Sequence, residues 1–403
     1  MVVAGEASGD ILAAELVHAL RAEISALPDE PSPDPQPARS SLAPRFFGAG
    51  GARMKEAGVD ISFDLTAYAA TGLTDVLKQI RHFRRRLLDL RDLAAKRQPD
   101  ALICVDFSGF NRRLAHAVRR RAGAPGDWFN AWRPLIVQYV SPQVWASRPG
   151  RATSMARDYD LLLCTFPFEK EWYARYAPGL AVEFVGNPVI DRYARLNADE
   201  LRRKRSEAAV PHLLLLPGSR LGELARHVPV MLEALKRIRA RYPDLEATLV
   251  LPNEALLKEL RRWGLPGGVR SQAGGLPDAL QRATVAIAST GTVLLECALF
   301  GVPTVALYKT SWLTYAIGKR IVTVEYMAMP NLLAGRQIMP EFIQSAATPE
   351  NIAGPVIQYL SDPQSRERAS GELSQVVQSL GMAGASQRAA RAILREMASK
   401  TRT

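Results

Sequence analysis

The sequence predicts an α/β protein in which parallel sheets pack between helices, and it predicts two domains. The first observation is a series of short apolar runs with almost nothing polar on either face, as strands buried on both sides require. The second is that helix-like segments separate these runs. The third is the length, because 403 residues allow two domains with their own cores.

Seven apolar runs are the candidate strands of these sheets. They are residues 101–105, 135–140, 161–164, 213–216, 247–251, 285–288 and 304–307. A polar, charge-rich segment at 186–211 precedes the fresh strand at 213–216, so we place the domain boundary there. This divides the chain into a first domain at 1–188, a second at 189–345, and C-terminal helices at 346–403 that can cross back to the first domain.

A Pro-rich stretch interrupts the first domain. Residues 28–44 contain six prolines and little apolar content. Such a composition cannot supply a packed core, so we expect a disordered surface insert.

Composition excludes several classes of protein. Hydrophobic residues at 47% and charged residues at 23% exclude a disordered or fibrous chain. The three cysteines are far apart in apolar runs, which favours a reducing compartment over a disulfide framework or metal cluster. We expect no signal peptide, and Glu296, Gly291 and two further breaks rule out a membrane span at 285–308.

Positive charge is concentrated in one part of the chain. The net charge is +12, and residues 78–121 hold 13 Lys and Arg against four Asp. Such a surface attracts nucleic acid, anionic lipid or an acidic substrate, and composition leaves these open. Residues 73–88 predict a basic amphipathic helix that either lies in a membrane interface or faces the core. If this helix lies in a membrane interface, its docking residues are Leu73, Val76, Leu77, Ile80, Phe83, Arg84 and Arg85.

Two segments of the second domain predict a strand, a tight turn and a helix, which present backbone N–H groups to an anion. In the first, residues 213–216 are followed by Pro217-Gly218-Ser219-Arg220, where Arg220 suits a forked contact with phosphate. In the second, Ser289-Thr290-Gly291-Thr292 precedes a helix with one charged residue, Glu296. A sugar diol or a structural salt bridge would satisfy that carboxylate.

The first domain has glycine-rich turns and one well-placed acid. The turn Gly5-Glu6-Ala7-Ser8-Gly9-Asp10 follows a short strand, and Gly48-Ala49-Gly50-Gly51 follows Arg45-Phe46-Phe47. Neither is a dinucleotide fingerprint. Asp106 comes directly after the buried run 101–105. Ligands of α/β sheets bind beyond the carboxyl ends of strands, so Asp106 suits acid–base work or a helix cap.

Seven motifs occur in order between residue 4 and about residue 344. They are Ala4-Gly5-Glu6-Ala7-Ser8-Gly9-Asp10, Asp106 with Phe110-Asn111, Tyr139-Val140-Ser141-Pro142-Gln143-Val144-Trp145, Phe166-Pro167-Phe168-Glu169, Leu216-Pro217-Gly218-Ser219-Arg220, Ser289-Thr290-Gly291-Thr292 with Glu296-Cys297, and Pro330-Asn331-Leu332-Leu333-Ala334-Gly335. Together they resemble the lipid-A-disaccharide synthases, bacterial glycosyltransferases with two facing Rossmann-like domains, a fold called GT-B.

The resemblance implies a reaction and a location. The family transfers 2,3-diacylglucosamine from its UDP donor to 2,3-diacylglucosamine 1-phosphate (lipid X), with inversion and a β-1,6 linkage, and uses neither metal nor cofactor. It implies a cytoplasmic monomer or homodimer that is peripheral on the inner face of the bacterial inner membrane, docks on anionic lipid and does not bind nucleic acid.

The resemblance also implies residue roles. Asp106 would be the general base. The UDP donor would contact Gly218, Ser219, Arg220, Ser289, Thr290, Gly291, Thr292, Glu296 and Asn331. The acceptor would contact Gly5, Glu6, Ser8, Gly9, Asp10, Gly50 and Gln143.

Two alternatives remain at this point. One is another UDP-sugar enzyme of the same fold, either a transferase with a polyprenyl-linked acceptor or a UDP-N-acetylglucosamine 2-epimerase. The other is a non-catalytic protein that binds nucleic acid or membrane through residues 78–121, which predicts salt-dependent binding without turnover.

Overall fold

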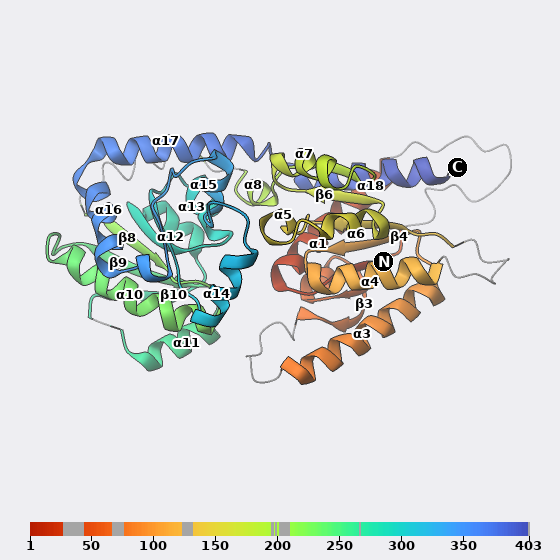
Figure 1. Ribbon diagram of the computed structural model, residues 1–403, viewed down its shortest axis with the longest axis horizontal. Coiled ribbons are helices and arrows are strands. Elements are labelled where there is room, and N and C mark those ends of the chain that lie inside the picture. The colour runs from red at the N-terminus through yellow and green to blue at the C-terminus, as the bar shows by residue number, and fades with distance from the viewer. Residues whose placement is uncertain are drawn as a thin grey trace. The chain divides into compact units, whose positions relative to one another are not determined.

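The computed structural model describes residues 1–26, 44–66, 76–122, 132–194, 197, 200, 210–265 and 267–401. The chain divides into two compact units, of which unit 1 is Met1–Asp191 with Met382–Thr403 and unit 2 is Arg192–Gly381. Each unit contains one parallel sheet between helices (Figure 1). The expected Pro-rich insert lies outside the described residues, apart from Pro44.

Within the described residues, unit 1 has a seven-stranded sheet in the order β3-β2-β1-β4-β5-β6-β7. The strands are β1 (Val2–Ala4), β2 (Phe47–Gly50), β3 (Asp60–Asp64), β4 (Ala101–Val105), β5 (Leu135–Tyr139), β6 (Leu161–Cys164) and β7 (Ala181–Phe184). The chain order reverses between β1 and β4, where Ala4 lies opposite Val105. Ligands of doubly wound sheets bind beyond the strand ends at such a reversal.

Helices cover both faces of this sheet. One face carries α1 (Ala7–Ser25) and α18 (Ala385–Thr401). The other carries α3 (Val76–Arg97), α4 (Ser108–Ala122), α6 (Arg151–Asp158) and α7 (Pro167–Tyr176). Shorter helices are α2 (Ala52–Glu56), α5 (Val144–Ser147) and α8 (Pro188–Arg192). The returning α18 is held to unit 1 by Arg388, whose Nε donates to the Val185 carbonyl at 2.7 Å.

Unit 2 has, in its described part, a six-stranded sheet in the order β10-β9-β8-β11-β12-β13. The strands are β8 (His212–Leu216), β9 (Glu246–Leu251), β10 (Val269–Ala273), β11 (Val285–Ser289), β12 (Thr304–Tyr308) and β13 (Glu341–Ile343). The reversal falls between β8 and β11, where Leu216 lies opposite Ala288. Unit 2 therefore repeats the strand order of a doubly wound fold.

The helices of unit 2 also lie on both faces. The largest apolar core joins one sheet face to α10 (Leu221–Arg239), α11 (Glu254–Trp263) and α16 (Pro349–Ser361). The other described elements are α12 (Leu276–Arg282), α13 (Val293–Leu299), α14 (Trp312–Ile321), α15 (Met329–Ala334), α17 (Pro363–Ser379) and the 3₁₀ turn Gln344–Ala346.

The predicted α/β class with parallel sheets is confirmed. All seven runs expected as strands are strands, as β4, β5, β6, β8, β9, β11 and β12. The sequence analysis missed β3, β7, β10 and β13, which are the edge strands of the two sheets. An edge strand is less fully covered, so its sequence lacks the continuous apolar run that marks an inner strand.

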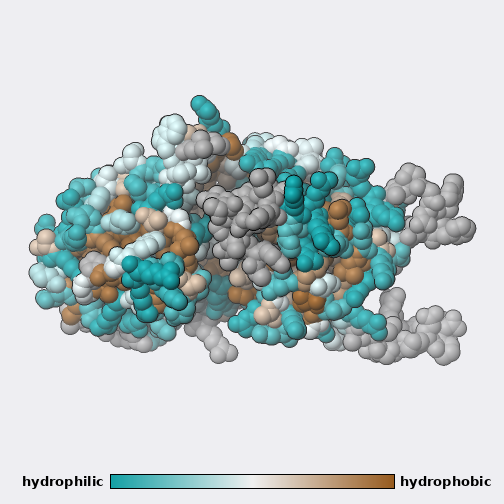
Figure 2. All heavy atoms as spheres, turned by 90° about the horizontal axis from the view of Figure 1, so that it is seen from below, coloured by the Kyte–Doolittle hydropathy of each residue, from teal (hydrophilic) through white to brown (hydrophobic). Residues whose placement is uncertain are grey.

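The hydrophobic surface and the length of the apolar helices are the two features of the structure that concern membrane contact. On the face in Figure 2, hydrophobic residues appear as patches between hydrophilic ones. Across the described helices, none is both long enough and apolar enough to cross a membrane.

Candidate functional site

Each sheet gathers sequence-predicted residues at its chain reversal. In unit 1, the turn after β1, Gly50 at the end of β2, Asp106 after β4 and the loop after β5 leave four neighbouring strands. In unit 2, the turns at 217–220 and 289–292 follow the paired strands β8 and β11. The predicted residues therefore form two groups, one in each unit.

Asp106 follows β4 in a strained backbone conformation. Its φ is 49° and that of Phe107 is 44°, a left-handed region that few residues other than glycine adopt. Burial raises the pKa of the Asp106 carboxyl, while hydrogen bonds from the Phe107 N–H and the Ser8 hydroxyl lower it. Within the described residues, no cation pairs with this carboxylate. A carboxylate with raised proton affinity and no cation suits a general base.

Two buried amides hold this turn in place. Asn111 Nδ2 donates to the carbonyl oxygens of Asp106 at 2.9 Å and Val105 at 3.2 Å. Gln138 Nε2 donates to the same Asp106 oxygen at 3.2 Å, and its Oε1 accepts from the Tyr159 hydroxyl at 3.0 Å. These contacts offset the backbone strain from outside the turn. The sequence analysis quoted Asn111 only within a motif and missed Gln138.

The glycine-rich turn after β1 packs closely on Asp106 and Phe107. A Cβ added to Gly5 would lie 2.1 Å from the Phe107 ring, and one added to Gly9 would lie 3.4 Å from the Asp106 Cβ. Ser8 is exposed and Glu6 is half-buried. A larger residue at Gly5 would therefore collide with the Phe107 ring, so glycine permits this close packing.

Asp10 lies in the first turn of α1 and has a different environment from Gly5 and Glu6 before it. It is buried, and its carboxylate accepts the N–H of Gly51 at 2.7 Å and of Arg53 at 2.9 Å. Asp10 therefore caps α2 and ties it to the end of β2, where a Cβ on Gly50 would lie 2.2 Å from the Met54 sulfur. The geometry favours structural roles for Asp10 and Gly50, and their contact with the acceptor stays a prediction.

The loop after β5 is organised by a second buried carboxylate. Glu169 accepts hydrogen bonds from the Ser141 hydroxyl at 2.8 Å and the Trp145 indole N–H at 2.9 Å. The N–H groups of Thr165 and Phe166 donate to its other oxygen. Burial raises the pKa of Glu169 to about 7, although the four hydrogen-bond donors lower it. This network joins two of the sequence motifs and leaves Gln143 on the exposed side of the loop.

In unit 2, a carboxylate from the first turn of α10 packs on the turn after β8. Gly218 has φ 117°, and a Cβ there would lie 2.3 Å from a carboxylate oxygen of Glu223. That carboxylate accepts the Ser219 N–H at 2.9 Å and lies 3.6 Å from the Arg220 guanidinium. The Arg220 side chain is 77% exposed, so its charge is available to an anion.

His227 is a residue of this region that the sequence analysis missed. It is fully buried, and its Nδ1 donates to the Pro217 carbonyl at 2.7 Å while its Nε2 accepts the Lys309 N–H at 2.9 Å. Burial lowers the pKa of His227, which keeps the ring neutral and suits this donor–acceptor pair. His227 thereby ties the turn after β8 to the end of β12.

The turn after β11 places Gly291 and Thr292 at the surface, whereas Ser289 is buried and Thr290 half-buried. Gly291 has φ 154°, and a Cβ there would meet nothing within 4 Å. The space beside Gly291 is therefore open to a ligand.

Glu296 forms an ion pair that the sequence analysis had kept as an alternative. One carboxylate oxygen lies 3.0 Å from Arg192 Nη1. Burial raises the pKa of Glu296, and the Arg192 charge and hydrogen bond, with a hydrogen bond from Tyr193, lower it. The partner was not predictable because 104 residues separate the two in sequence.

Asn331 is fully buried in α15. Its Nδ2 donates to the Met339 carbonyl and to Glu341 Oε2, and its Oδ1 accepts the N–H groups of Ile338 and Met339. All of its polar capacity is used inside unit 2. The geometry favours a structural role, and donor contact by Asn331 stays a prediction.

The basic helix expected at 73–88 is α3, which begins at Val76. Leu73 and the side chains of Val76, Leu77 and Ile80 lie outside the described residues. Phe83 packs with ring centroids 5.8 Å from Phe107 and 6.0 Å from Phe110. Its ring therefore packs on the core of unit 1 and is half-buried, and contact of Phe83 with a membrane stays a prediction.

The other membrane-docking candidates that the structure describes are two arginines of α3. Arg84 and Arg85 are exposed on α3, as is Leu88, which is 40% exposed.

Comparison with known proteins identifies the family. The family model described as lipid-A-disaccharide synthetase matches residues 1–395. The chain belongs to this family. It is 37% identical over 399 residues to the lipid-A-disaccharide synthase of Geobacter sulfurreducens, covering 98% of this chain and 96% of that protein. It is 36% identical over 398 residues to that of Myxococcus xanthus, with the same two shares.

Solved structures support the fold. A putative UDP-N-acetylglucosamine 2-epimerase from Listeria monocytogenes matches with a TM-score of 0.58 at 16% identity, over 100% of this chain and 96% of that one. MurG of Acinetobacter baumannii matches with a TM-score of 0.54 at 15% identity, over 98% and 99%. The chain is thus a GT-B glycosyltransferase of lipid A synthesis, an enzyme with a UDP-sugar donor and a lipid acceptor.

Proposed function

We propose that this enzyme transfers 2,3-diacylglucosamine from UDP-2,3-diacylglucosamine to lipid X with inversion, giving the β-1,6-linked disaccharide 1-phosphate and UDP. Family membership supports these classes of donor and acceptor. Asp106 is the observation that carries the proposal. It combines a raised pKa with a place beyond the end of β4, beside the turn of small residues after β1.

Asp106 is the general base. Its carboxylate takes the proton of the acceptor 6-hydroxyl as that oxygen attacks the anomeric carbon of the donor. The bond from that carbon to the UDP oxygen breaks, and UDP leaves with the electron pair. Attack opposite to the leaving group inverts the anomeric centre. The Ser8 hydroxyl and the Phe107 N–H orient the carboxylate, and Gly5, Glu6 and Gly9 border the acceptor.

Unit 2 binds the UDP part of the donor. Gly218, Ser219 and the exposed Arg220 lie beside the turn at 289–292, and this combination of small residues, hydroxyls and a guanidinium suits a diphosphate. The positive charge of Arg220 stabilises the charge that grows on departing UDP. Glu296, held by Arg192, accepts hydrogen bonds from the ribose hydroxyls.

The N-terminal half of α3 docks the enzyme on anionic lipid through Arg84 and Arg85. Each basic residue near such a surface contributes about 1 kcal/mol, so Arg84→Gln with Arg85→Gln should weaken binding to phosphatidylglycerol vesicles by about tenfold or more. The matched control is Arg91→Gln with Arg97→Gln, because both arginines of that pair already contact aspartates. Equal losses in the two double variants would contradict docking through Arg84 and Arg85.

The reaction is tested by product analysis. Purified protein is mixed with UDP-2,3-diacylglucosamine and lipid X in the presence of a chelator, and the lipids are examined by mass spectrometry and NMR. We expect a tetraacyl disaccharide 1-phosphate with a β linkage, together with UDP. An α linkage, an epimerised UDP-sugar or the absence of a disaccharide would contradict the proposal.

A further inference from the structure

Four arginines that have no acidic partner among the described residues follow β4 and β5, at the same edge of the unit 1 sheet as Asp106. Arg112 and Arg113 are in the first turns of α4, which begins two residues after Asp106. Arg148 and Arg151 flank the Pro149-Gly150 step between α5 and α6, on the chain that leaves the neighbouring strand β5. We call these four residues the arginine cluster.

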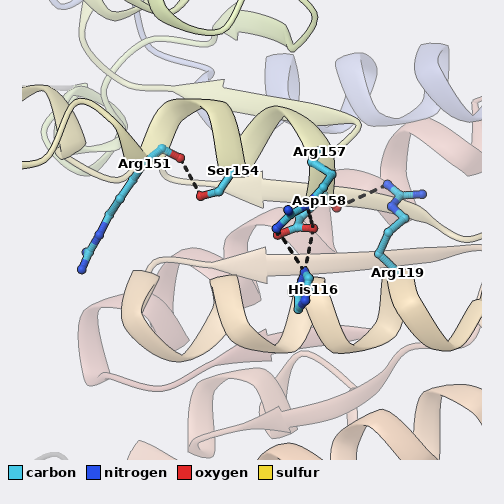
Figure 3. Close-up of polar contacts among 6 residues, drawn as sticks. All are labelled: His116, Arg119, Arg151, Ser154, Arg157 and Asp158. Atoms are coloured by element: carbon cyan, nitrogen blue, oxygen red, sulfur yellow. Dashed lines mark hydrogen bonds and ion pairs between the residues drawn. The ribbon is translucent and has the colours of Figure 1, made fainter.

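The members of the cluster are close enough to act on one another. Helices α4 and α6 pack together, and burial, followed by the positive charges of Arg148, Arg112 and Arg113, lowers the pKa of the Arg151 guanidinium. Figure 3 shows the Arg151 side chain extended away from Ser154 and from the polar contacts farther along α6. Like charges held together cost free energy unless an anion binds between them.

Other arginines of α4 and α6 form ion pairs with aspartates. Farther along, Arg119 lies 2.6 Å from Asp160. Arg157 lies 3.2 Å from Asp158, which also contacts His116 (Figure 3). In the described part of the chain, no carboxylate pairs with any member of the arginine cluster. Among the guanidinium groups of the cluster, Arg113 Nη1 donates to the Gly109 carbonyl oxygen at 2.8 Å.

We propose that the arginine cluster binds the phosphate monoester of the acceptor. This inference rests on the proposed function and names the partner of one end of the acceptor. A phosphate monoester carries close to two negative charges at neutral pH and accepts forked contacts from guanidinium groups. With its phosphate on the cluster and its attacking hydroxyl at Asp106, the acceptor sugar has both ends fixed. This orientation selects the hydroxyl remote from the phosphate as the nucleophile.

The test compares two acceptors and two variants. The cluster variant is Arg148→Gln with Arg151→Gln, and the control is Arg157→Gln, which removes a paired arginine from the same helix. With lipid X, the cluster variant should raise the KM for the acceptor about tenfold or more while the KM for the donor stays unchanged. With the same acceptor lacking its phosphate, wild type and cluster variant should have equal KM values.

Two outcomes of this comparison would overturn the proposal. One is an equal loss on both acceptors, and the other is an unchanged KM for lipid X in the cluster variant. Binding to phosphatidylglycerol vesicles separates the two sources of phosphate. If the cluster variant loses vesicle binding but keeps its KM for lipid X, the cluster binds membrane phospholipid and the proposal is wrong.

A binding measurement separates this proposal from the proposed function. Glucosamine 1-phosphate is titrated into the wild-type protein and the two variants without any donor. We expect binding that the cluster variant weakens about tenfold and Arg157→Gln leaves unchanged. If wild type binds this probe through the cluster but makes no disaccharide, the proposed function fails and the phosphate site stands. If the cluster variant binds the probe as well as wild type does, the site is wrong.

Discussion

Asp106 in unit 1 and Glu296 in unit 2 are carboxylates at corresponding chain reversals, but their surroundings differ. Burial raises the pKa of both. The neighbours of Asp106 are a hydroxyl and an N–H, whereas Glu296 also contacts the Arg192 guanidinium at 3.0 Å. A carboxylate with neutral donors can accept a proton, but one paired with a cation remains an anion and accepts hydrogen bonds.

This difference teaches how two units of similar topology can take different tasks. In unit 1 the buried amides of Asn111 and Gln138 hold the strained backbone at Asp106. Within the described residues, no cation pairs with the Asp106 carboxylate. In unit 2 the charge of Glu296 is met within the unit, which suits binding rather than proton transfer.

The largest effect is expected for Asp106→Asn. An amide cannot take the proton of the attacking hydroxyl, so turnover should fall by about 10²–10⁴. The measurement is kcat with both substrates saturating. The matched control is Asp100→Asn, an exposed aspartate just before β4, which should keep kcat near the wild-type value. A kcat for Asp106→Asn close to wild type would remove the base from this account.

The next effect concerns the support of that carboxylate. Asn111→Ala removes a buried donor from the carbonyls of Asp106 and Val105, and Gln138 Nε2 still donates to the Asp106 oxygen, so the free energy of unfolding should fall by about 1–3 kcal/mol. Denaturant titration measures this, and kcat should fall while UDP affinity is kept. Asn351→Ala, at an exposed helix start, should change stability by under about 0.5 kcal/mol. Equal effects of the two substitutions would mean that Asn111 does not hold the turn.

A smaller effect is expected at Glu296. Glu296→Gln keeps the shape but weakens the acceptor of the ribose hydrogen bonds, so UDP affinity should fall about tenfold in a calorimetric titration. Arg192→Gln removes the partially exposed partner and should cost about 1 kcal/mol of stability with less effect on UDP. If Glu296→Gln lowers stability but not UDP affinity, the carboxylate is only structural.

The smallest effect is a shift in pH dependence. The Ser8 hydroxyl favours the ionised form of Asp106 and lowers its pKa. Ser8→Ala removes that donor, so the pKa should rise further and the acid limb of kcat/KM should move to higher pH. A limb that stays in place or moves to lower pH would show that Ser8 does not contact the catalytic carboxylate.

The parts of this structure that the sequence predicted are those that a local pattern encodes. Inner strands such as β4 and β11 have continuous apolar runs, and Asp106 follows the end of one of them. The edge strands β3 and β13 lack such runs because one side of each is unpaired.

The parts that the sequence could not predict depend on side chains far apart along the chain. Gln138 reaches Asp106 across 32 residues, and His227 reaches Lys309 across 82. The sequence also could not predict the contacts of Asp10 and Asn331. Both residues are in recognisable motifs, but their side chains accept hydrogen bonds from nearby backbone N–H groups. A motif places a residue at a strand end, but only the packing decides whether its side chain faces a ligand.

We propose that proton transfer belongs to Asp106 and UDP binding to Glu296 and its neighbours. The most direct test titrates UDP into Asp106→Asn and Glu296→Gln by calorimetry and measures kcat for the same two preparations. We expect Asp106→Asn to bind UDP with wild-type affinity while losing turnover, and Glu296→Gln to lose UDP affinity while keeping most turnover at saturating donor. A loss of UDP affinity in Asp106→Asn, or a loss of saturated turnover in Glu296→Gln as large as that in Asp106→Asn, would contradict this division.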